Sequence, residues 1–302
     1  MSLLVVGSIA LDTMKMPNGK VYKNVPGGSC AYFVHSARFF SPTRVVGVVG
    51  KDFPKKSIEA FKKAKADLTG LQIQPGKTFQ WHGTYMADMN NRTTDALHFG
   101  VLGTFDPVLP KKYRDSTCIF LACSQPELQM RVLDQVGGSP LAVCDTIEVY
   151  IKDSRPALDK LIRRCQGMIV NDTEAKLLTG DDNLVATANA IHKKYKLEFL
   201  VVKKGEHGGM LVTKDGIVPF AAYPLAKVAD PTGAGDCFAG GFMGTLAKTG
   251  KRDAKTLRLA VANATAVASC CCEGIAQTAL LKATAAQIRA RSSAFVKMTR
   301  LG

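Results

Sequence analysis

Short hydrophobic runs rich in β-branched residues recur along the chain, separated by segments whose apolar positions have helical spacing. Each run has the length and composition of a buried β-strand. The runs are Leu3–Val6, Val45–Val49, Cys118–Ala122, Leu141–Cys144, Met168–Val170 and Leu200–Val202. Strands that alternate with helices predict a mostly parallel sheet covered by helices on both faces, with ligands at the carboxyl ends of the strands.

Two segments depart from this alternation. Residues 13–26 are rich in turn-forming residues, and residues 77–104 alternate polar and apolar positions, with Phe79, Trp81 and Tyr85 on one parity. We predict that they form a small β-sheet standing off the main sheet as a lid, because a long non-helical excursion in a compact α/β domain is usually functional. Ordinary surface hairpins are the alternative.

Length and composition predict one globular α/β domain over residues 1–302, since 46% of the residues are apolar and the sequence contains no low-complexity linker. The apolar start lacks a basic leader and is interpreted as a buried strand rather than a signal peptide. No run reaches the length of a membrane span. Nine cysteines without a C-x-x-C pair favour the reducing cytoplasm.

The net charge of +15 is compatible with a nucleic-acid or membrane partner, or with a basic cleft for anionic ligands. The lysines are dispersed, and the densest run, residues 51–65, has helix-like spacing without interleaved aromatic residues. We therefore predict a small-molecule substrate and neither a nucleic-acid nor a membrane partner.

The most specific motif is the glycine-rich string from Asp230 to Gly241, which opens onto a helix. Backbone amides of Gly233, Ala234 and Gly235 are expected to point at one anion at the helix N-terminus. Asp236 would be held ionised there and could accept the proton of an attacking hydroxyl. The alternative is that Asp236 is only a helix-capping residue.

The full string resembles the signature of the ribokinase-like carbohydrate kinases, the PfkB family, which includes adenosine and other nucleoside kinases. The resemblance covers nearly the whole chain, with matching segments in the same order. It implies a ribokinase-like three-layer α/β/α sandwich with a small β-sheet lid. It also implies an ATP- and Mg²⁺-dependent transfer of the γ-phosphate to a hydroxyl of a small sugar-like substrate, with Asp236 as the base.

On the substrate side, the segment ending at Asp12 resembles the family's first strand, whose aspartate binds substrate hydroxyls, although Asp12 could instead cap a turn. Gly27 and Gly28 resemble the glycine pair beside the sugar. Tyr32 stands where many members have an asparagine that contacts the sugar. A phenol there favours stacking or a bulkier, less polar substrate.

On the nucleotide side, Asn171 to Glu174 is similar to the family's N-x-x-E motif, whose acidic residue places Mg²⁺ and phosphate through water. The same residues also read as a helix start with an N-terminal asparagine. Lys203 precedes a turn whose Gly205 and Gly208 match the family's nucleotide-binding turn. Lys203 is either a point charge on ATP phosphates or a solvated lysine.

Three further residues complete the resemblance. Asn263 lies on a segment similar to the family's adenine-side helix, and Asp230 with Thr232 resembles half of the K⁺ site that some members use. No P-loop, Rossmann or H-E-x-x-H motif is present, and the histidines are scattered. Exposed edges of the lid could pair between subunits, so a homodimer is plausible.

Three functions remain open from the sequence. The first is a sugar kinase. The second is a nucleoside kinase whose base stacks on aromatic residues near Phe33 or Trp81. The third is a catalytically inactive relative that binds a ligand or regulates a partner, against which the intact catalytic motif and Glu174 argue.

Overall fold

The main β-sheet is mostly parallel. The computed structural model describes residues 1–89 and 91–300, and its main sheet has the strand order β13-β12-β11-β10-β9-β8-β1-β4-β5. The strands are β1 (Leu3–Val6), β4 (Thr43–Gly50), β5 (Asp67–Gln74), β8 (Cys118–Leu121), β9 (Leu141–Cys144), β10 (Gly167–Asn171), β11 (Phe199–Lys203), β12 (Gly209–Thr213) and β13 (Gly216–Phe220). Neighbours from β11 to β5 run parallel, whereas β12 and β13 form an antiparallel edge. The predicted sheet is confirmed.

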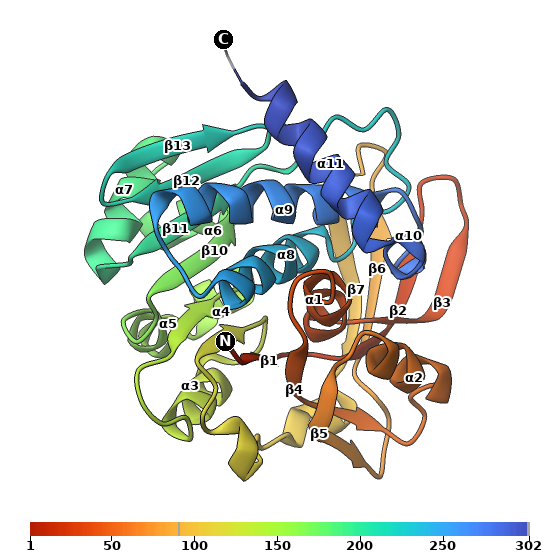
Figure 1. The fold of residues 1–302 in the computed structure, drawn as a ribbon. Coiled ribbons are helices and arrows are strands. Elements are labelled where there is room, and N and C mark those ends of the chain that lie inside the picture. Colours follow the sequence, from red (N-terminus) through yellow and green to blue (C-terminus); the bar gives the residue numbers. More distant parts are fainter. Residues whose placement is uncertain (90, 301–302) are drawn as a thin grey trace.

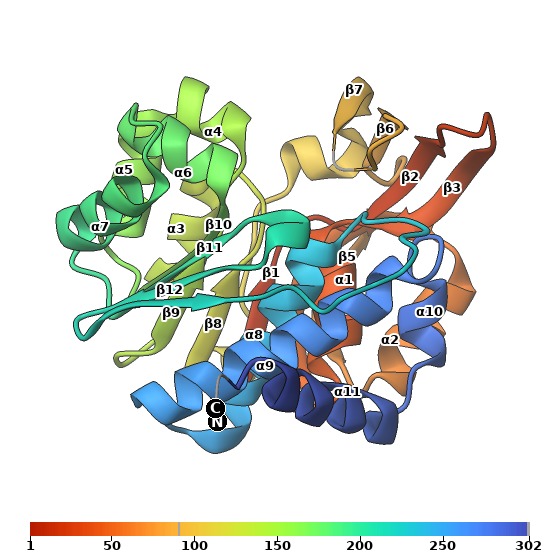
Figure 2. The same ribbon diagram turned by 90° about the horizontal axis from the view of Figure 1, so that it is seen from above.

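Helices cover both faces of this sheet (Figure 2). One layer consists of α1 (Ser29–Ala37), α2 (Lys55–Lys63), α8 (Ala234–Thr249), α9 (Ala254–Cys272), α10 (Thr278–Lys282) and α11 (Ala285–Met298). The other consists of α3 (Pro126–Asp134), α4 (Glu148–Asp153), α5 (Arg155–Ile162), α6 (Asp172–Thr179) and α7 (Leu184–Tyr195). Alternate residues of β1 pack into different layers, Leu3 and Val5 into the first and Leu4 and Val6 into the second. The three-layer α/β/α sandwich is therefore confirmed.

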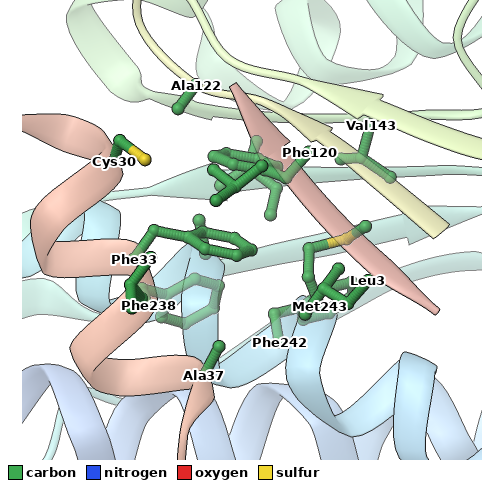
Figure 3. Packing of buried hydrophobic residues seen from close by; sticks show 14 of the residues in the cluster. Leu3, Cys30, Phe33, Ala37, Phe120, Ala122, Val143, Phe238, Phe242 and Met243 are labelled. Atoms are coloured by element: carbon green, nitrogen blue, oxygen red, sulfur yellow. The ribbon is translucent and has the colours of Figure 1, made fainter. Parts of the chain in front are cut away.

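Aromatic side chains fill the core between α1, α8 and the sheet (Figure 3). The ring of Phe33 stacks on Phe120 with centroids 4.8 Å apart, and Phe33 is fully buried. A nucleobase therefore does not stack on the ring of Phe33 itself, whereas stacking on other aromatic residues, Trp81 among them, stays a prediction.

A second, smaller sheet stands beside α1 and α10 (Figure 1). It has the order β3-β2-β6-β7 and is called the lid sheet below. Its strands are β2 (Ala10–Lys15), β3 (Val21–Gly27), β6 (Gln80–Tyr85) and β7 (Arg92–His98). The predicted small sheet is confirmed, whereas its action as a lid, pairing through its edges and the single-domain organisation stay predictions.

Two boundaries differ from the prediction. The first strand ends at Val6, and Asp12 lies in β2 of the lid sheet rather than at the end of the first strand. Residues 100–104 form a short 3-10 helix, and Val101 in it packs into the core with residues of β4. The lid sheet therefore includes Ala10 and ends at His98.

The chain crosses from one side of β1 to the other at the point where ligands are expected. Strand β1 pairs with β4 on one side and with β8 on the other, so the order of strands reverses there, and such switch points form crevices at the carboxyl edge.

None of the helices in residues 1–89 and 91–300 combines the length and the apolar character that a membrane span needs.

Candidate active site

The glycine-rich motif forms a tight turn, residues 230–236, which leads into α8 and is called the anion turn below. Gly233 is the N-cap of α8 with φ of 74°, a left-handed conformation that favours glycine. Asp230 stabilises the turn, because its Oδ1 accepts hydrogen bonds from the N–H of Thr232 at 2.8 Å and from the Thr232 hydroxyl at 2.5 Å.

The backbone amides of this turn divide into two groups. The N–H of Ala234 donates to the carbonyl of Pro231 at 3.0 Å, so this amide is used within the turn and does not point at an anion as expected. The amides of Gly235 and Asp236 lie in the first turn of α8, where N–H groups have no intrahelical acceptor. These two amides are available to an anion, and the predicted role of the Gly233 amide stays a prediction.

Tyr32 lies beneath the anion turn. Its side chain is 2% exposed, and a methyl group added to Gly233 would lie 2.3 Å from its ring. Burial raises the pKa of Tyr32 well above its usual value, and the charges of Asp12 and Asp230 add to this effect. The buried ring supports the turn, so the expected stacking of Tyr32 on a substrate is wrong; a contact through its hydroxyl stays a prediction.

Asp236 lies between two basic side chains. A methyl group added to Gly235 would lie 2.8 Å from Lys203 Nζ, so the ammonium of the partly exposed Lys203 lies at the anion turn; its contact with ATP phosphates stays a prediction. Removal from water raises the pKa of Asp236 to about 6, while the charges of Lys203 and Arg92 act in the opposite direction. Burial thus outweighs the two positive charges, and the carboxylate remains mostly ionised at pH 7.

Asp12 is buried on the lid side of the same site. It is 5% exposed, and a methyl group added to Gly27 would lie 1.9 Å from its Oδ2. Burial raises the pKa of Asp12 to about 7, with further contributions from the charges of Asp230 and Asp236. Gly28 has φ of 88° and begins α1. The structure therefore brings Asp12, which is predicted to bind the substrate, close to Asp236, the predicted base.

Asn171 and Glu174 form the start of α6. The Asn171 side chain accepts a hydrogen bond from the N–H of Glu174, and Glu174 Oε2 accepts one from the N–H of Asn171, both at 2.8 Å. This reciprocal cap confirms the helix-start interpretation. Burial raises the pKa of Glu174, while the charges of Lys203 and Arg92 act in the opposite direction.

The sequence analysis missed Asp145, which directly follows β9. Burial raises the pKa of Asp145 well above its usual value, and the charges of Asp236 and Glu174 add to this effect. Among the described residues, no hydrogen-bond partner meets its buried Oδ1. An unsatisfied carboxylate oxygen near Glu174 fits a hydrated Mg²⁺, which keeps most of its waters. The available signal was an acidic residue directly after a buried strand.

Arg92 was missed as well. It begins β7, opposite Tyr85 of β6 in the lid sheet, and its charge lowers the pKa of both Asp236 and Glu174. No local motif marks this arginine, because only the packing of the lid sheet over the main sheet brings it to the site.

The turn after Lys203 depends on its glycines. Gly205 has φ of 55° and Gly208 has φ of 80°, and a methyl group added to Gly208 would lie 2.0 Å from the carbonyl oxygen of Phe220. The N–H of Lys204 closes the turn by donating to the Gly208 carbonyl at 2.7 Å. Nucleotide binding by this turn stays a prediction.

Asn263 lies in the middle of α9, away from the anion turn. Its Nδ2 donates to Thr245 Oγ1 at 3.0 Å, and its Oδ1 accepts from Ser292 Oγ at 2.8 Å. Thr245 follows Asp236 by nine residues in α8, a separation of about 13 Å along a helix. Asn263 is thus remote from the predicted base, and its adenine contact stays a prediction.

The predicted K⁺ ligands are occupied by protein donors. Besides the two bonds from Thr232, Asp230 Oδ2 accepts a hydrogen bond from the N–H of Ala276 at 2.6 Å, and Asp230 is fully buried. Three of the roughly four acceptor positions of this carboxylate are used. One acceptor position of Asp230 remains, and K⁺ binding by Asp230 and Thr232 stays a prediction.

Comparisons with known proteins identify the family. The family described as pfkB family carbohydrate kinase matches residues 129–280. The chain is 31% identical over 251 residues to a cytidine kinase of Thermococcus kodakarensis, covering 80% of this chain and 87% of that protein. The chain belongs to the PfkB family. This PfkB protein is accordingly a kinase of an ATP-using family whose members act on nucleosides or carbohydrates.

Solved structures agree with the fold. A nucleoside kinase of Burkholderia thailandensis in complex with inosine superposes with a TM-score of 0.80 at 21% identity, covering 98% of both chains. An E. coli chain assigned as ribokinase II, with ATP and Mg²⁺, gives a TM-score of 0.81 at 18% identity and covers 97% of this chain and 99% of that chain. The ribokinase-like fold of this PfkB protein is thereby confirmed.

Proposed function

We propose that this PfkB kinase transfers the γ-phosphate of ATP to a primary hydroxyl of a nucleoside. The observation that carries the proposal is an aromatic surface beside Asp12 on the inner face of the lid sheet. The similarity to the T. kodakarensis cytidine kinase over 87% of its length supports the same substrate class.

The register of the lid sheet positions this aromatic surface. Strands β2 and β6 run parallel, with Met14 opposite Gly83, and Ala10 is bridged to Phe79. This register sets Trp81 level with Asp12 and on the same face of the sheet. A base needs a flat apolar surface, whereas a free sugar needs polar partners for many hydroxyls, so the surface favours a nucleoside.

A second aromatic ring extends this surface. Phe79 stacks with Phe99, with centroids 5.9 Å apart, and Phe99 is 50% exposed. The exposed ring of Phe99 extends the aromatic surface from Phe79 and is available to a base, in contrast to the buried Phe33.

Asp236 carries the acid–base step. The oxygen of the substrate hydroxyl forms a bond to the γ-phosphorus of ATP, and the bond between the γ-phosphorus and the β-phosphate oxygen breaks. The carboxylate of Asp236 takes the proton of the hydroxyl during this step. Its pKa of about 6 leaves it ionised at pH 7 and closer to the working pH than an ordinary aspartate, which favours a general base.

Charges around Asp236 stabilise the transferring phosphate. Lys203 approaches the anion turn at Gly235, and Arg92 lies near enough to lower the pKa of Asp236. With the amides of the first turn of α8 they surround the position where charge develops. Mg²⁺, when bound through water to Glu174 and Asp145, supplies positive charge to the ATP phosphates.

Asp12 positions the acceptor. Its buried carboxylate, with Gly27 against it, is suited to accept hydrogen bonds from two sugar hydroxyls and so orient the reacting hydroxyl toward Asp236. The lid sheet would exclude water from the closed site and suppress ATP hydrolysis.

Replacing Phe79 by Leu tests the substrate class. The loss of one stacking ring raises KM for the preferred nucleoside roughly 5- to 100-fold and leaves KM for ATP nearly unchanged. The matched control is Phe39→Leu, an aromatic position in the helical layer next to Phe40, which leaves both constants unchanged. A marked preference of the wild type for a free hexose over all nucleosides would instead favour the sugar-kinase function. The similarity to a fructokinase of E. coli, at 24% identity, supports this alternative.

A further inference from the structure

A chain of hydrogen bonds joins the lid sheet to the anion turn. The hydroxyl of Tyr85, at the end of β6, lies 2.6 Å from Thr232 Oγ1. Thr232 Oγ1 lies 2.5 Å from Asp230 Oδ1. Gly233 directly follows Thr232 and is the N-cap of α8, so the chain reaches the backbone that carries Asp236.

The direction of this chain follows from its acceptor end. Asp230 Oδ1 accepts from the N–H of Thr232 and Oδ2 from the N–H of Ala276, so the carboxylate acts as an acceptor at both oxygens. The hydroxyl of Thr232 must then donate to Asp230, and the hydroxyl of Tyr85 must donate to Thr232. Burial raises the pKa of Tyr85 to about 12, so its proton is retained at neutral pH.

Apolar side chains surround the ring of Tyr85, and its hydrogen bond to Thr232 is partly buried. Tyr85 is 3% exposed and packs in one cluster with Met14 and Met16 of the lid side and Ala276 from the segment after α9. Trp81 lies edge-on to it with ring centroids 6.4 Å apart. A hydrogen bond in such surroundings is costly to leave unmade, because water does not replace the lost partner.

Tyr85 also bears on the position of Arg92. The two residues are opposite each other in the antiparallel pair of β6 and β7. Anchoring Tyr85 to Thr232 therefore holds the end of the hairpin that carries Arg92.

We propose that Tyr85 is a positioning residue that latches the lid sheet onto the anion turn and thereby fixes the end of the hairpin that carries Arg92. The latch itself rests on the geometry alone, whereas its effect on turnover rests on the proposed function. Tyr85 acts through Thr232 and takes no part in the chemical step.

Two readouts on Tyr85→Phe test the latch, one of them independent of any substrate. Trp81 is the single tryptophan of the chain, so its emission reports the lid sheet at this contact. The variant is expected to show red-shifted emission and stronger quenching by acrylamide. With ATP and the preferred nucleoside, kcat falls roughly 5- to 100-fold while KM for ATP is little changed, because the partly buried Thr232 oxygen loses its donor.

A double-mutant cycle with Thr232→Val separates a latch from general damage. If Tyr85 acts through Thr232, the second substitution adds little to the first, in emission as in kcat. Thr232→Ser keeps the hydroxyl and is expected to retain wild-type behaviour. Tyr22→Phe is the matched control, since Tyr22 packs against the same cluster, and it leaves emission and kcat unchanged.

The outcomes separate the two claims. Unchanged Trp81 emission in Tyr85→Phe, or additive effects of the two substitutions, overturns the latch whatever the activity shows. Absence of phosphotransfer to every nucleoside by the wild type overturns the proposed function, and the emission measurements still decide the latch.

Discussion

At the scale of single residues, the site concentrates negative charge where water is scarce. Asp12, Asp230 and Asp236 are close enough for the charges of the last two to raise the pKa of the first. Such groups cost stability and are retained where they perform chemistry. The pKa shifts therefore predict how both folding and activity depend on pH.

The pH dependence of stability tests the environment of Asp12. Its folded-state pKa of about 7 exceeds the unfolded value of 3.8, so the folded state binds more protons between these values. The contribution of Asp12 to the free energy of unfolding is constant below pH 4. It falls by on the order of 2–4 kcal/mol as the pH rises to 7, so the protein becomes less stable. Asp12→Asn removes this fall.

Urea unfolding at pH 5 and pH 7.5 measures this effect. We expect the wild type to lose more stability between the two pH values than Asp12→Asn. Asp215→Asn, a substitution in the exposed turn between β12 and β13, serves as control and behaves like the wild type. Parallel pH profiles of wild type and Asp12→Asn would contradict the buried environment.

Residues with a local signature were predictable from the sequence. Gly233 and Asp236 stand in a string that specifies both a turn and a helix start, and the structure places them there. Asp145 and Arg92 were missed, because their role depends on which strands and sheets become neighbours, and no local pattern encodes that. The prediction that Tyr32 stacks on the substrate was made because the sequence does not reveal that the ring is buried beneath the turn. This burial also depends on tertiary packing.

At the scale of elements, the N-terminus of α8 is the part on which the account depends. Its first turn needs a left-handed Gly233, and the ring of Tyr32 from α1 fills the space where a side chain would stand. Two independent restraints thus exclude any larger residue at this position.

Gly233→Ala tests the contact between these elements. Gly180 offers a matched control, because its φ of 75° equals that of Gly233 within a degree, and nothing lies within 4 Å of an added methyl group. Gly180→Ala should cost about 1 kcal/mol for the backbone conformation alone. Gly233→Ala should cost clearly more in urea unfolding and should strongly reduce kcat. Equal losses in the two variants would show that the Tyr32 contact contributes nothing.

Most elements followed from the hydrophobic pattern, but not all. Runs buried on both faces, such as β1, β9 and β11, were predicted nearly to the residue. Strand β5 was not, because this edge strand is only partly buried and its polar residues break the alternation. Strand β2 was merged with β1, because both are apolar and only three residues separate them.

At the scale of the whole molecule, both sheets contribute side chains to the candidate active site. The carboxyl edge of the main sheet contributes Asp145, Glu174 and Lys203, and the lid sheet contributes Asp12 and Arg92. The site is complete only where the two sheets meet. This explains why the sequence predicted the family and the catalytic motif but left the substrate open.

The central claim is that this PfkB kinase phosphorylates a nucleoside with Asp236 as the base. The most direct measurement is product formation by mass spectrometry with ATP and Mg²⁺ over a panel of nucleosides, free sugars and cyclitols. Asp236→Asn serves as the blank and Asp215→Asn as its control. We expect a nucleoside monophosphate as the main product, a loss of roughly 10²- to 10⁴-fold in kcat for Asp236→Asn, and wild-type activity for Asp215→Asn. Near wild-type turnover by Asp236→Asn, or a phosphorylated free sugar as the main product, would contradict the account.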